Sequence, residues 1–330
     1  MRENAYVSIL TNGVTVRYNK IRIYNYSVKE IYTMLGPITG TFIDEITYDI
    51  PSSNWSQKQW RRDLDNMQRV GIDTLIFIRG GFYGKTVYPS RVFGTESTDD
   101  FAGFILKEAA KRRMKVFMGL YISTIDWNGG DAAGEIALNR KFIDEVYNRY
   151  SGIPSLAGWY IPQEASKNEL NITEVMKGLS YLCKEKDSKM PVLISPYFNT
   201  HVTGGDFSVS QHAEEWYDIF SECSRQIDYC AFQDGSAPIE AMREYFVKTK
   251  ELCDEFGITH WVNTETFERD VRRMYYPIPF PLLREKLDMH REYAEKIITF
   301  EFSHFLSPQS IYPSARNLNR LYVDYYRKRR

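Results

Sequence analysis

The sequence is poor in the residues from which metal centres and disulfide frameworks are built. Its 330 residues include only 4 cysteines and 5 histidines. They form no CxxC, His-x-His or mixed Cys/His group with the spacing of metal ligands. We therefore expect no metal site. Cys183 and Cys253 fall in helical patterns and are expected to be reduced core residues. The sequence does not decide whether Cys223 and Cys230 form a disulfide.

Excess charge, long apolar runs and phosphate-binding loops are also missing. Lys and Arg number 42 against 43 Asp and Glu, so neither nucleic acid nor an anionic membrane is an expected partner. No apolar run reaches the length of a membrane span. The lack of a signal peptide at Met1 predicts a cytoplasmic protein, or a periplasmic or secreted one if a leader has been trimmed from the chain. With no glycine-rich phosphate loop, we expect no nucleotide, flavin or other cofactor.

What the sequence does contain is a series of short apolar runs, each followed by turn residues. They recur about every 35 to 40 residues, the length of one strand–helix unit, and amphipathic segments such as SQKQWRRDLDNMQRVGI lie between them. The runs cover residues 38–46, 74–81, 115–123, 156–164, 191–199, 228–235, 259–267 and 298–305. Strands that alternate with helices become parallel through right-handed crossovers. The pattern predicts an α/β fold, a (β/α)8 TIM barrel.

An open, doubly wound sheet is the alternative. Such a sheet usually has a glycine-rich phosphate turn after its first strand, whereas this chain has Asp44 and Glu45 there. We expect the barrel to occupy residues 38–330. Residues 1–37 include the alternating stretch TNGVTVRYNKIRIYNY, which predicts a short β extension packed on the barrel.

Polar residues gather where the predicted strands end, as in the stretch GWYIPQEAS, in which an apolar strand runs into Gln163 and Glu164. The chemistry of such barrels is carried at the carboxyl ends of the strands. The candidate site residues there are Asp44, Glu45, Arg79, Tyr121, Trp127, Gln163, Glu164, Tyr197, Asn199, Gln233, Asp234, Asn263, Glu265 and His304. Asp44 and Glu45 should point to opposite faces of their strand, so at most one of them enters the mouth. The segment 266–281, with its YYPIPFP stretch, is expected to form a wall of the cleft.

The composition of this ring of side chains favours one chemistry. No strand end offers a lysine for a Schiff base, and the GxSxG motif of serine hydrolases is absent. Paired carboxylates, amides and aromatic rings are the groups that hydrolyse glycosidic bonds, because one carboxyl protonates the leaving oxygen while the other attacks the sugar or activates water. The expected partner is therefore an oligosaccharide or polysaccharide.

These residues give the chain a resemblance to the large retaining glycoside hydrolase superfamily called clan A, and more closely to DUF4434-type barrels. The resemblance covers roughly residues 38 to 310. It implies that Glu164, after strand four, is the general acid/base, that Glu265, ending strand seven, is the nucleophile, and that Arg79 holds the nucleophile ionised. The sequence departs from the clan at Gln163, where an asparagine is usual, and at Phe302 to His304, where a tryptophan commonly ends strand eight.

Two other interpretations remain beside the retaining hydrolase. Asp234 lies in a QDG turn and could form an inverting pair with Glu164. The barrel could also bind carbohydrate without cleaving it. Several candidates have structural explanations as well: Arg79 could pair with Asp44, Glu265 could pair with Arg269, and single aromatic residues such as Trp127 and Tyr197 often serve packing.

Overall fold

The computed structural model describes residues 7–11, 14–18, 37–47, 52, 54–96, 98–123, 125–200, 208–235, 237–269 and 274–327. The chain divides into two units, Met1–Met34 and Leu35–Arg330. In the first unit, β1 (Val7–Thr11) and β2 (Val14–Tyr18) pair as an antiparallel hairpin. The rest of the alternating stretch, beyond Tyr18, lies outside the described residues, and its packing on the barrel stays a prediction.

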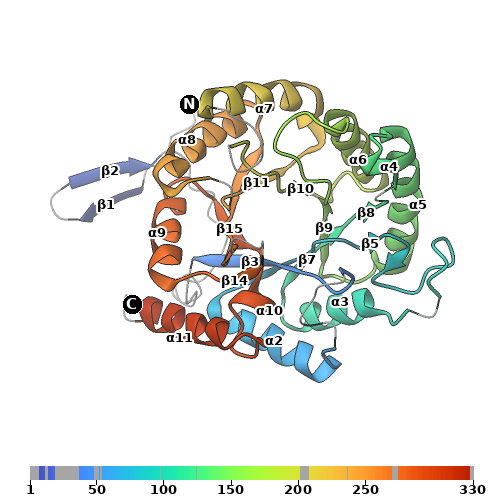
Figure 1. Cartoon of the computed structure of the whole chain (residues 1–330), viewed down its shortest axis with the longest axis horizontal. Coiled ribbons are helices and arrows are strands. Elements are labelled where there is room, and N and C mark those ends of the chain that lie inside the picture. The colour runs from blue at the N-terminus through green and yellow to red at the C-terminus, as the bar shows by residue number, and fades with distance from the viewer. Residues whose placement is uncertain are drawn as a thin grey trace. The chain divides into compact units, whose positions relative to one another are not determined.

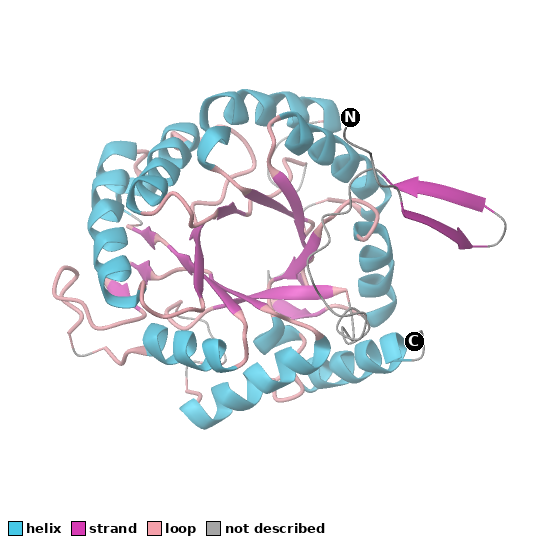
Figure 2. Ribbon diagram, turned by 180° about the vertical axis from the view of Figure 1, so that it is seen from behind, coloured by secondary structure: helices cyan, strands magenta, loops and turns pink. Residues whose placement is uncertain are grey.

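The second unit is a closed barrel of parallel strands (Figures 1 and 2). Around the barrel, each strand pairs with the next one along the chain, and the last pairs with the first. The strands are β3 (Ile38–Ile43), β4 (Thr74–Phe77), β7 (Lys115–Gly119), β9 (Leu156–Ile161), β10 (Val192–Ile194), β11 (Tyr229–Gln233), β12 (Thr259–Asn263) and β15 (Lys296–Thr299). The predicted TIM barrel is confirmed, and the open sheet is excluded.

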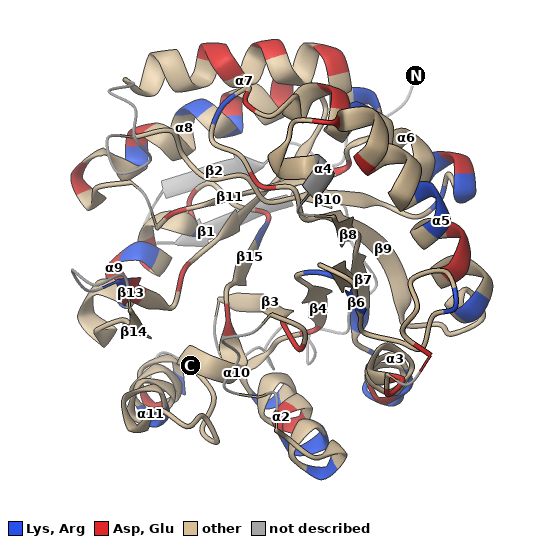
Figure 3. Cartoon of the chain, turned by 45° about the vertical axis from the view of Figure 1, so that its right-hand side comes forward, with Lys and Arg blue, Asp and Glu red and all other residues tan. Residues whose placement is uncertain are grey.

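A long helix follows each barrel strand and packs on its outer side (Figure 1). These helices are α2 (Gln57–Val70), α3 (Phe101–Lys111), α5 (Ala132–Tyr150), α6 (Ile172–Lys186), α7 (Val209–Cys223), α8 (Ile239–Glu255), α9 (Phe280–His290) and α11 (Pro313–Arg327). Most charged residues lie on their surfaces (Figure 3). None of the helices in the described part of the chain has the length and apolar composition that crossing a membrane requires.

The first helix shows how local sequence sets the boundaries of these elements. The Ser56 side chain accepts a hydrogen bond from the backbone N–H of Gln59, and the Gln59 side chain accepts one from the backbone N–H of Ser56. At the other end, Gly71 takes the left-handed conformation with φ of 99°, which a glycine adopts without strain. Gly71 therefore forms the C-cap of α2.

Several predicted strands extend too far at their carboxyl ends. β9 ends at Ile161, three residues before Glu164, and β15 covers Lys296–Thr299 rather than a run to residue 305. Residues Phe302–Phe305 instead form the short helix α10. The apolar pattern continues past the last strand pairing because loop residues at the barrel mouth are also buried, so hydrophobicity alone cannot mark where the strand stops.

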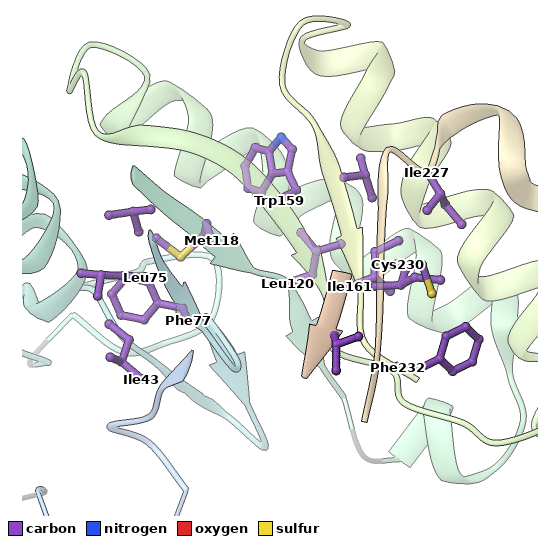
Figure 4. Packing of buried hydrophobic residues seen from close by; sticks show 14 of the residues in the cluster. Ile43, Leu75, Phe77, Met118, Leu120, Trp159, Ile161, Ile227, Cys230 and Phe232 are labelled. Atoms are coloured by element: carbon purple, nitrogen blue, oxygen red, sulfur yellow. The ribbon is translucent and has the colours of Figure 1, made fainter. Parts of the chain in front are cut away.

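Alternation along the strands produces two separate cores. The inner one fills the barrel and consists of Phe42, Ile76, Ile78, Phe117, Tyr160, Leu193, Ala231, Trp261 and Ile298. The outer one lies between strands and helices and includes Leu75, Phe77, Met118 and Trp159 (Figure 4). Because the inner core closes the barrel interior, side chains that follow on the inward face, such as Gln233 and Asn263, lie above it at the mouth.

Candidate active site

A cavity of about 410 Å³ lies at the mouth of the barrel, where the strands end. Strand ends form its polar side, and the loops after β12 and β15 form an apolar wall. The lining residues are Asp44, Thr47, Ile78, Arg79, Glu164, Gln233, Asn263, Glu265, Phe267, Arg269, Met274, Tyr275, Phe300, His304, Phe305 and Tyr312. The cavity brings together seven of the candidate residues, including both predicted catalytic carboxylates.

Glu164 enters this cavity from the loop after β9. Tyr160 lies four residues before Glu164 on the same face. Its hydroxyl donates a hydrogen bond of 2.8 Å to Glu164 Oε1. Burial raises the pKa of Glu164, and this effect outweighs the positive charge of Arg79 and the hydrogen bonds from Gln233 and Tyr160. The carboxyl therefore holds its proton to a higher pH than an exposed glutamate, as a general acid requires.

Glu265 follows β12 and lies across the end of the neighbouring strand β11. Its backbone N–H donates to Asp234 Oδ1 over 2.9 Å. Its carboxyl lies directly against Gly235, so closely that a Cβ at that position would come within 1.7 Å of Glu265 Oε2. Burial, followed by the negative charge of Asp234, raises the pKa of Glu265 to about 7, although Lys286 and Arg269 oppose the rise.

Asp234 is fully buried and does not line the cavity. Its Oδ1 atom accepts the Glu265 N–H and lies 3.0 Å from Lys286 Nζ, and its Oδ2 atom lies 3.6 Å from His290 Nε2. A carboxylate held in this way has no access to a substrate in the cavity. The inverting pair of Glu164 and Asp234 is therefore not supported by this geometry.

Arg79 was expected to hold Glu265 but contacts another carboxylate. Its Nη1 atom donates to Thr47 Oγ1 over 2.9 Å and lies 3.6 Å from Asp44 Oδ2, and its guanidinium lies over the Phe82 ring at 5.0 Å. The reason is strand order: β4, which Arg79 follows, pairs directly with β3, which Asp44 follows. The structural alternative for Arg79 is thus observed, and Glu265 forms an ion pair with Arg269, at 4.0 Å.

Two candidates lie on the outer face because they are sequence neighbours of inward-facing carboxylates. Glu45 lies beyond Asp44 and accepts a hydrogen bond of 3.4 Å from Ser52, outside the cavity lining. Burial raises the pKa of Glu45 to about 8. Gln163 donates to the carbonyl of Tyr121 at 2.9 Å and to Glu135 at 2.5 Å. Neither residue lines the cavity, whereas Asp44 does, in agreement with the expectation that at most one of Asp44 and Glu45 enters the mouth.

Four further candidates do not line the cavity: Tyr121, Trp127, Tyr197 and Asn199. The Tyr121 hydroxyl accepts the Gly84 N–H at 2.7 Å, and its ring stacks on Phe93 at 4.7 Å. Trp127 is buried, and the Asn199 carbonyl accepts a bond from Tyr245. Tyr197 bridges to Gln233 through the backbone. The contacts of Tyr121 and Asn199 are therefore with loops around the mouth, outside the cavity lining.

The remaining candidates, Gln233, Asn263 and His304, do line the cavity. Gln233 donates to the Ser195 carbonyl at 2.6 Å, and Asn263 donates to the Ser195 hydroxyl at 3.1 Å. His304 Nδ1 lies 3.1 Å from Glu301 Oε1. Burial lowers the pKa of His304 to about 3, so at neutral pH this imidazole is uncharged and supplies hydrogen bonding rather than positive charge.

Sequence reasoning missed several residues of the site. Tyr160 had a usable signal, since it lies four residues before Glu164 and alternation puts both on the same face. Phe300 had the same kind of signal, two residues after the barrel-filling Ile298. The aromatic wall comes from loops, and Lys286 comes from a helix, so neither has a strand-end signature. Tyr275 does belong to the YYPIPFP stretch, and its place in the cavity confirms that this segment forms a wall.

The described residues contain no group of three or more His, Cys, Asp or Glu side chains arranged to hold a metal ion. All four cysteines are buried and free, so the open question of a Cys223–Cys230 disulfide is answered. The site offers carboxyl, amide, hydroxyl, guanidinium and aromatic groups, which is a set that can bind a hydroxyl-rich ligand.

The fold and site define a (β/α)8 barrel with a carboxylate-lined cavity at the carboxyl ends of its strands. Residues 38–312 match the family described as "Domain of unknown function (DUF4434)", and the chain belongs to that family. A search of the curated proteins finds no match.

Solved structures share this barrel. A crystal structure of a protein from Bacteroides thetaiotaomicron VPI-5482, named a "putative alpha-L-fucosidase", is 38% identical, with a TM-score of 0.84 over 93% of this chain and 99% of that one. An endo-1,4-beta-mannanase from Rhizomucor miehei is 14% identical, with a TM-score of 0.56 over 89% and 95% of the two chains. A GH10 xylanase from Thermobacillus composti is 15% identical, with a TM-score of 0.52 over 88% and 91%. At these identities the latter two show the fold alone.

Proposed function

We propose that the protein is a glycoside hydrolase that retains anomeric configuration, with Glu164 as general acid/base and Glu265 as nucleophile. The observation that carries the proposal is the presence of these two carboxyls in one cavity, where burial raises the pKa of Glu164 as a general acid requires. The printed name of the structural relative that is 38% identical, "putative alpha-L-fucosidase", supports the same class of reaction.

In the first step, Glu164 gives its proton to the glycosidic oxygen while the Glu265 carboxylate attacks the anomeric carbon. The bond from that carbon to the leaving oxygen breaks, and a covalent glycosyl–enzyme ester forms. In the second step, Glu164, now ionised, takes a proton from water, and the water oxygen displaces Glu265 from the sugar. The enzyme returns to its starting protonation state, and two inversions give net retention.

The surrounding side chains fit this division of roles. The hydroxyl of Tyr160 orients the Glu164 carboxyl, and the Arg79–Asp44 pair offers a charged hydrogen-bonding edge on the same side of the cavity. Opposite them, Tyr275 and Phe305 belong to the apolar wall, where an aromatic ring can pack against the C–H face of a sugar. Along the strand order, Gln233 at the end of β11 lies between Glu164, which follows β9, and Glu265, which follows β12, and Asn263 ends β12 itself.

The test compares Glu164→Gln with Glu265→Gln on activated aryl glycosides, with fucosides, mannosides and xylosides in the panel because of the named relatives. Glu265→Gln should lose at least about 1,000-fold in kcat, because an amide cannot form the ester. Glu164→Gln should still form the intermediate from an activated leaving group, and azide should restore its turnover by attacking without a base. Equal loss in both variants, with no effect of azide, would contradict the assignment.

A barrel that binds carbohydrate without cleaving it is the second candidate. The observation that favours it is the place of Arg79, which pairs with Asp44 rather than with Glu265 and so leaves the proposed nucleophile with a high pKa. Glycan binding measured by calorimetry, together with no turnover across the whole panel between about pH 5 and pH 9, would support this candidate.

A further inference from the structure

The proposed mechanism leaves one buried cation without a role, Lys286. Its side chain comes from α9, is only 5% exposed and does not line the main cavity. A buried ammonium is costly unless it is paired. Lys286 Nζ lies 3.0 Å from Asp234 Oδ1, so the charge is paired at the base of the site rather than at the protein surface.

The same Asp234 oxygen also receives the backbone N–H of Glu265, at 2.9 Å. One carboxylate oxygen thus joins the helix that carries Lys286 to the residue that carries the proposed nucleophile. Lys286, Asp234 and Glu265 also line a second cavity of about 370 Å³, which shares Glu265 with the main cavity. Asp234 and Glu265 are two acidic groups on adjacent strands, and their repulsion needs a nearby positive charge.

We propose that Lys286 is a positioning residue that, through Asp234, holds the backbone of Glu265 in place and supplies the positive charge that lets the Glu265 carboxyl ionise. It takes the part expected of Arg79. The catalytic role of the Lys286 charge rests on the proposed function. Its effect on the ionisation of Glu265 does not.

Of the other positively charged groups near Glu265 in the described ranges, none is as well shielded from water. Arg269 is 50% exposed, lies 4.0 Å from Glu265 and covers the rings of Phe267 and Tyr275. At that exposure its field is weakened by water and salt. Arg79 pairs with Asp44 and donates a hydrogen bond to Thr47.

His290 and the surrounding acids complete the set of groups that face this site. His290 is buried, and burial lowers its pKa well below the usual range, so it stays neutral beside Asp234. Asp234 and Glu164 both act to raise the pKa of Glu265. Glu268 follows on β13 (Phe267–Arg269) and feels the same Lys286 charge. Lys286 is therefore the buried positive charge in this part of the described chain.

The test reads the ionisation of Glu265 directly and needs no substrate. Protein labelled with ¹³C at the glutamate carboxyls is titrated by NMR, and the Glu265 signal is assigned by its loss in Glu265→Gln. The wild-type midpoint should lie near pH 7. Lys286→Met should raise it by about one pH unit or more, Lys286→Arg should keep it near the wild-type value, and Asp234→Asn should lower it.

A lysine with a purely structural role would not shift the Glu265 midpoint in opposite directions in Lys286→Met and Asp234→Asn. If Lys286→Met does not fold, the other two variants still test the proposal. A lower Glu265 midpoint in Asp234→Asn, together with a wild-type midpoint in Lys286→Arg, supports it. An unchanged midpoint in a folded Lys286→Met, or no fall in Asp234→Asn, overturns it. Shifted midpoints with no turnover of any glycoside would leave this inference standing while the proposed function fails.

Discussion

The Glu265 carboxyl lies against the backbone of Gly235, with Oε2 at the place where a Cβ would stand. Glu265, two residues beyond the end of β12, therefore reaches across the end of β11, and the direction of its side chain depends on the absence of a side chain at Gly235. A sequence that carried any other residue at position 235 would have to aim the carboxyl elsewhere. This contact ties the proposed nucleophile to a single glycine.

The first prediction follows from that contact. Gly235→Ala should displace the Glu265 carboxyl and lower kcat/KM by at least about 100-fold, because a misplaced nucleophile loses its near-attack geometry. The clash falls on the free end of a side chain, so the melting temperature should change little. Gly152→Ala is the matched control, since a Cβ there meets nothing within 4 Å. Wild-type activity in Gly235→Ala would show that the orientation of Glu265 does not matter.

The second prediction concerns the hydrogen bond that the Tyr160 hydroxyl donates to Glu164. Tyr160→Phe removes a hydrogen bond that favours the ionised carboxyl, so the pKa of Glu164 should rise further. The alkaline limb of the kcat/KM profile should move to higher pH, and the maximum should fall roughly tenfold. Tyr322→Phe is the control, because this buried hydroxyl instead accepts the N–H of Ile38, at the start of β3. A shifted limb in the control, or none in Tyr160→Phe, would contradict the assignment.

The third prediction concerns the apolar wall. Tyr275 and Tyr276 are neighbours on β14 (Tyr275–Pro277) and are 42% and 43% exposed, but only Tyr275 lines the cavity. Tyr275→Ala should therefore weaken glycan binding or raise KM roughly tenfold, through loss of ring contact with a sugar. Tyr276→Ala should leave both unchanged. Equal effects of the two changes would mean that the wall does not touch the substrate.

The fourth prediction uses Glu45, whose pKa is raised by burial to about 8. Because the folded pKa exceeds the unfolded one, wild type should lose stability as the pH rises from about 4.5 towards 8. Glu45→Gln cannot ionise, so its stability relative to wild type should grow over that window, by roughly 2 kcal/mol at about pH 8. Urea unfolding at about pH 5 and pH 8 measures the difference, and a constant difference would refute the cause.

Glu108 provides a control of opposite sign for that experiment. Burial alone would raise the pKa of Glu108, but hydrogen bonds from Lys111, Arg112 and Arg61 outweigh this effect and lower the pKa to about 2. Its contribution to stability is therefore present above the unfolded pKa and is lost as the pH falls towards 2. Glu108→Gln should be destabilised at neutral pH, and the deficit should shrink in acid.

The sequence was sufficient for the barrel and for the two carboxyls because both depend on strand alternation. Apolar runs repeat with the period of strand–helix units, and Glu164 and Glu265 continue the inward-facing series above Tyr160 and Asn263. The same alternation predicts that at most one of Asp44 and Glu45 enters the mouth, and it would also have placed Gln163, one residue before Glu164, outside the cavity lining.

What the sequence could not provide is the direction of long side chains and the contacts between distant elements. Arg79 is flexible enough to reach either Asp44 or Glu265, and only the paired strands β3 and β4 decide between them. Lys286 lies on a helix whose pattern shows only which face is buried, not that its ammonium meets Asp234. The role of such residues depends on packing.

The central claim, that Glu265 becomes covalently bound to the sugar, is tested most directly by trapping that ester. Glu164→Gln and wild type are incubated with a panel of 2-deoxy-2-fluoro glycosyl fluorides, in which the fluorines slow the second step and supply a good leaving group. The account predicts an intact-mass increase of one sugar, located by peptide mass spectrometry on Glu265 and absent in Glu265→Gln. Label on another carboxylate, or turnover of a natural glycoside with inversion seen by NMR and no label at all, would contradict it.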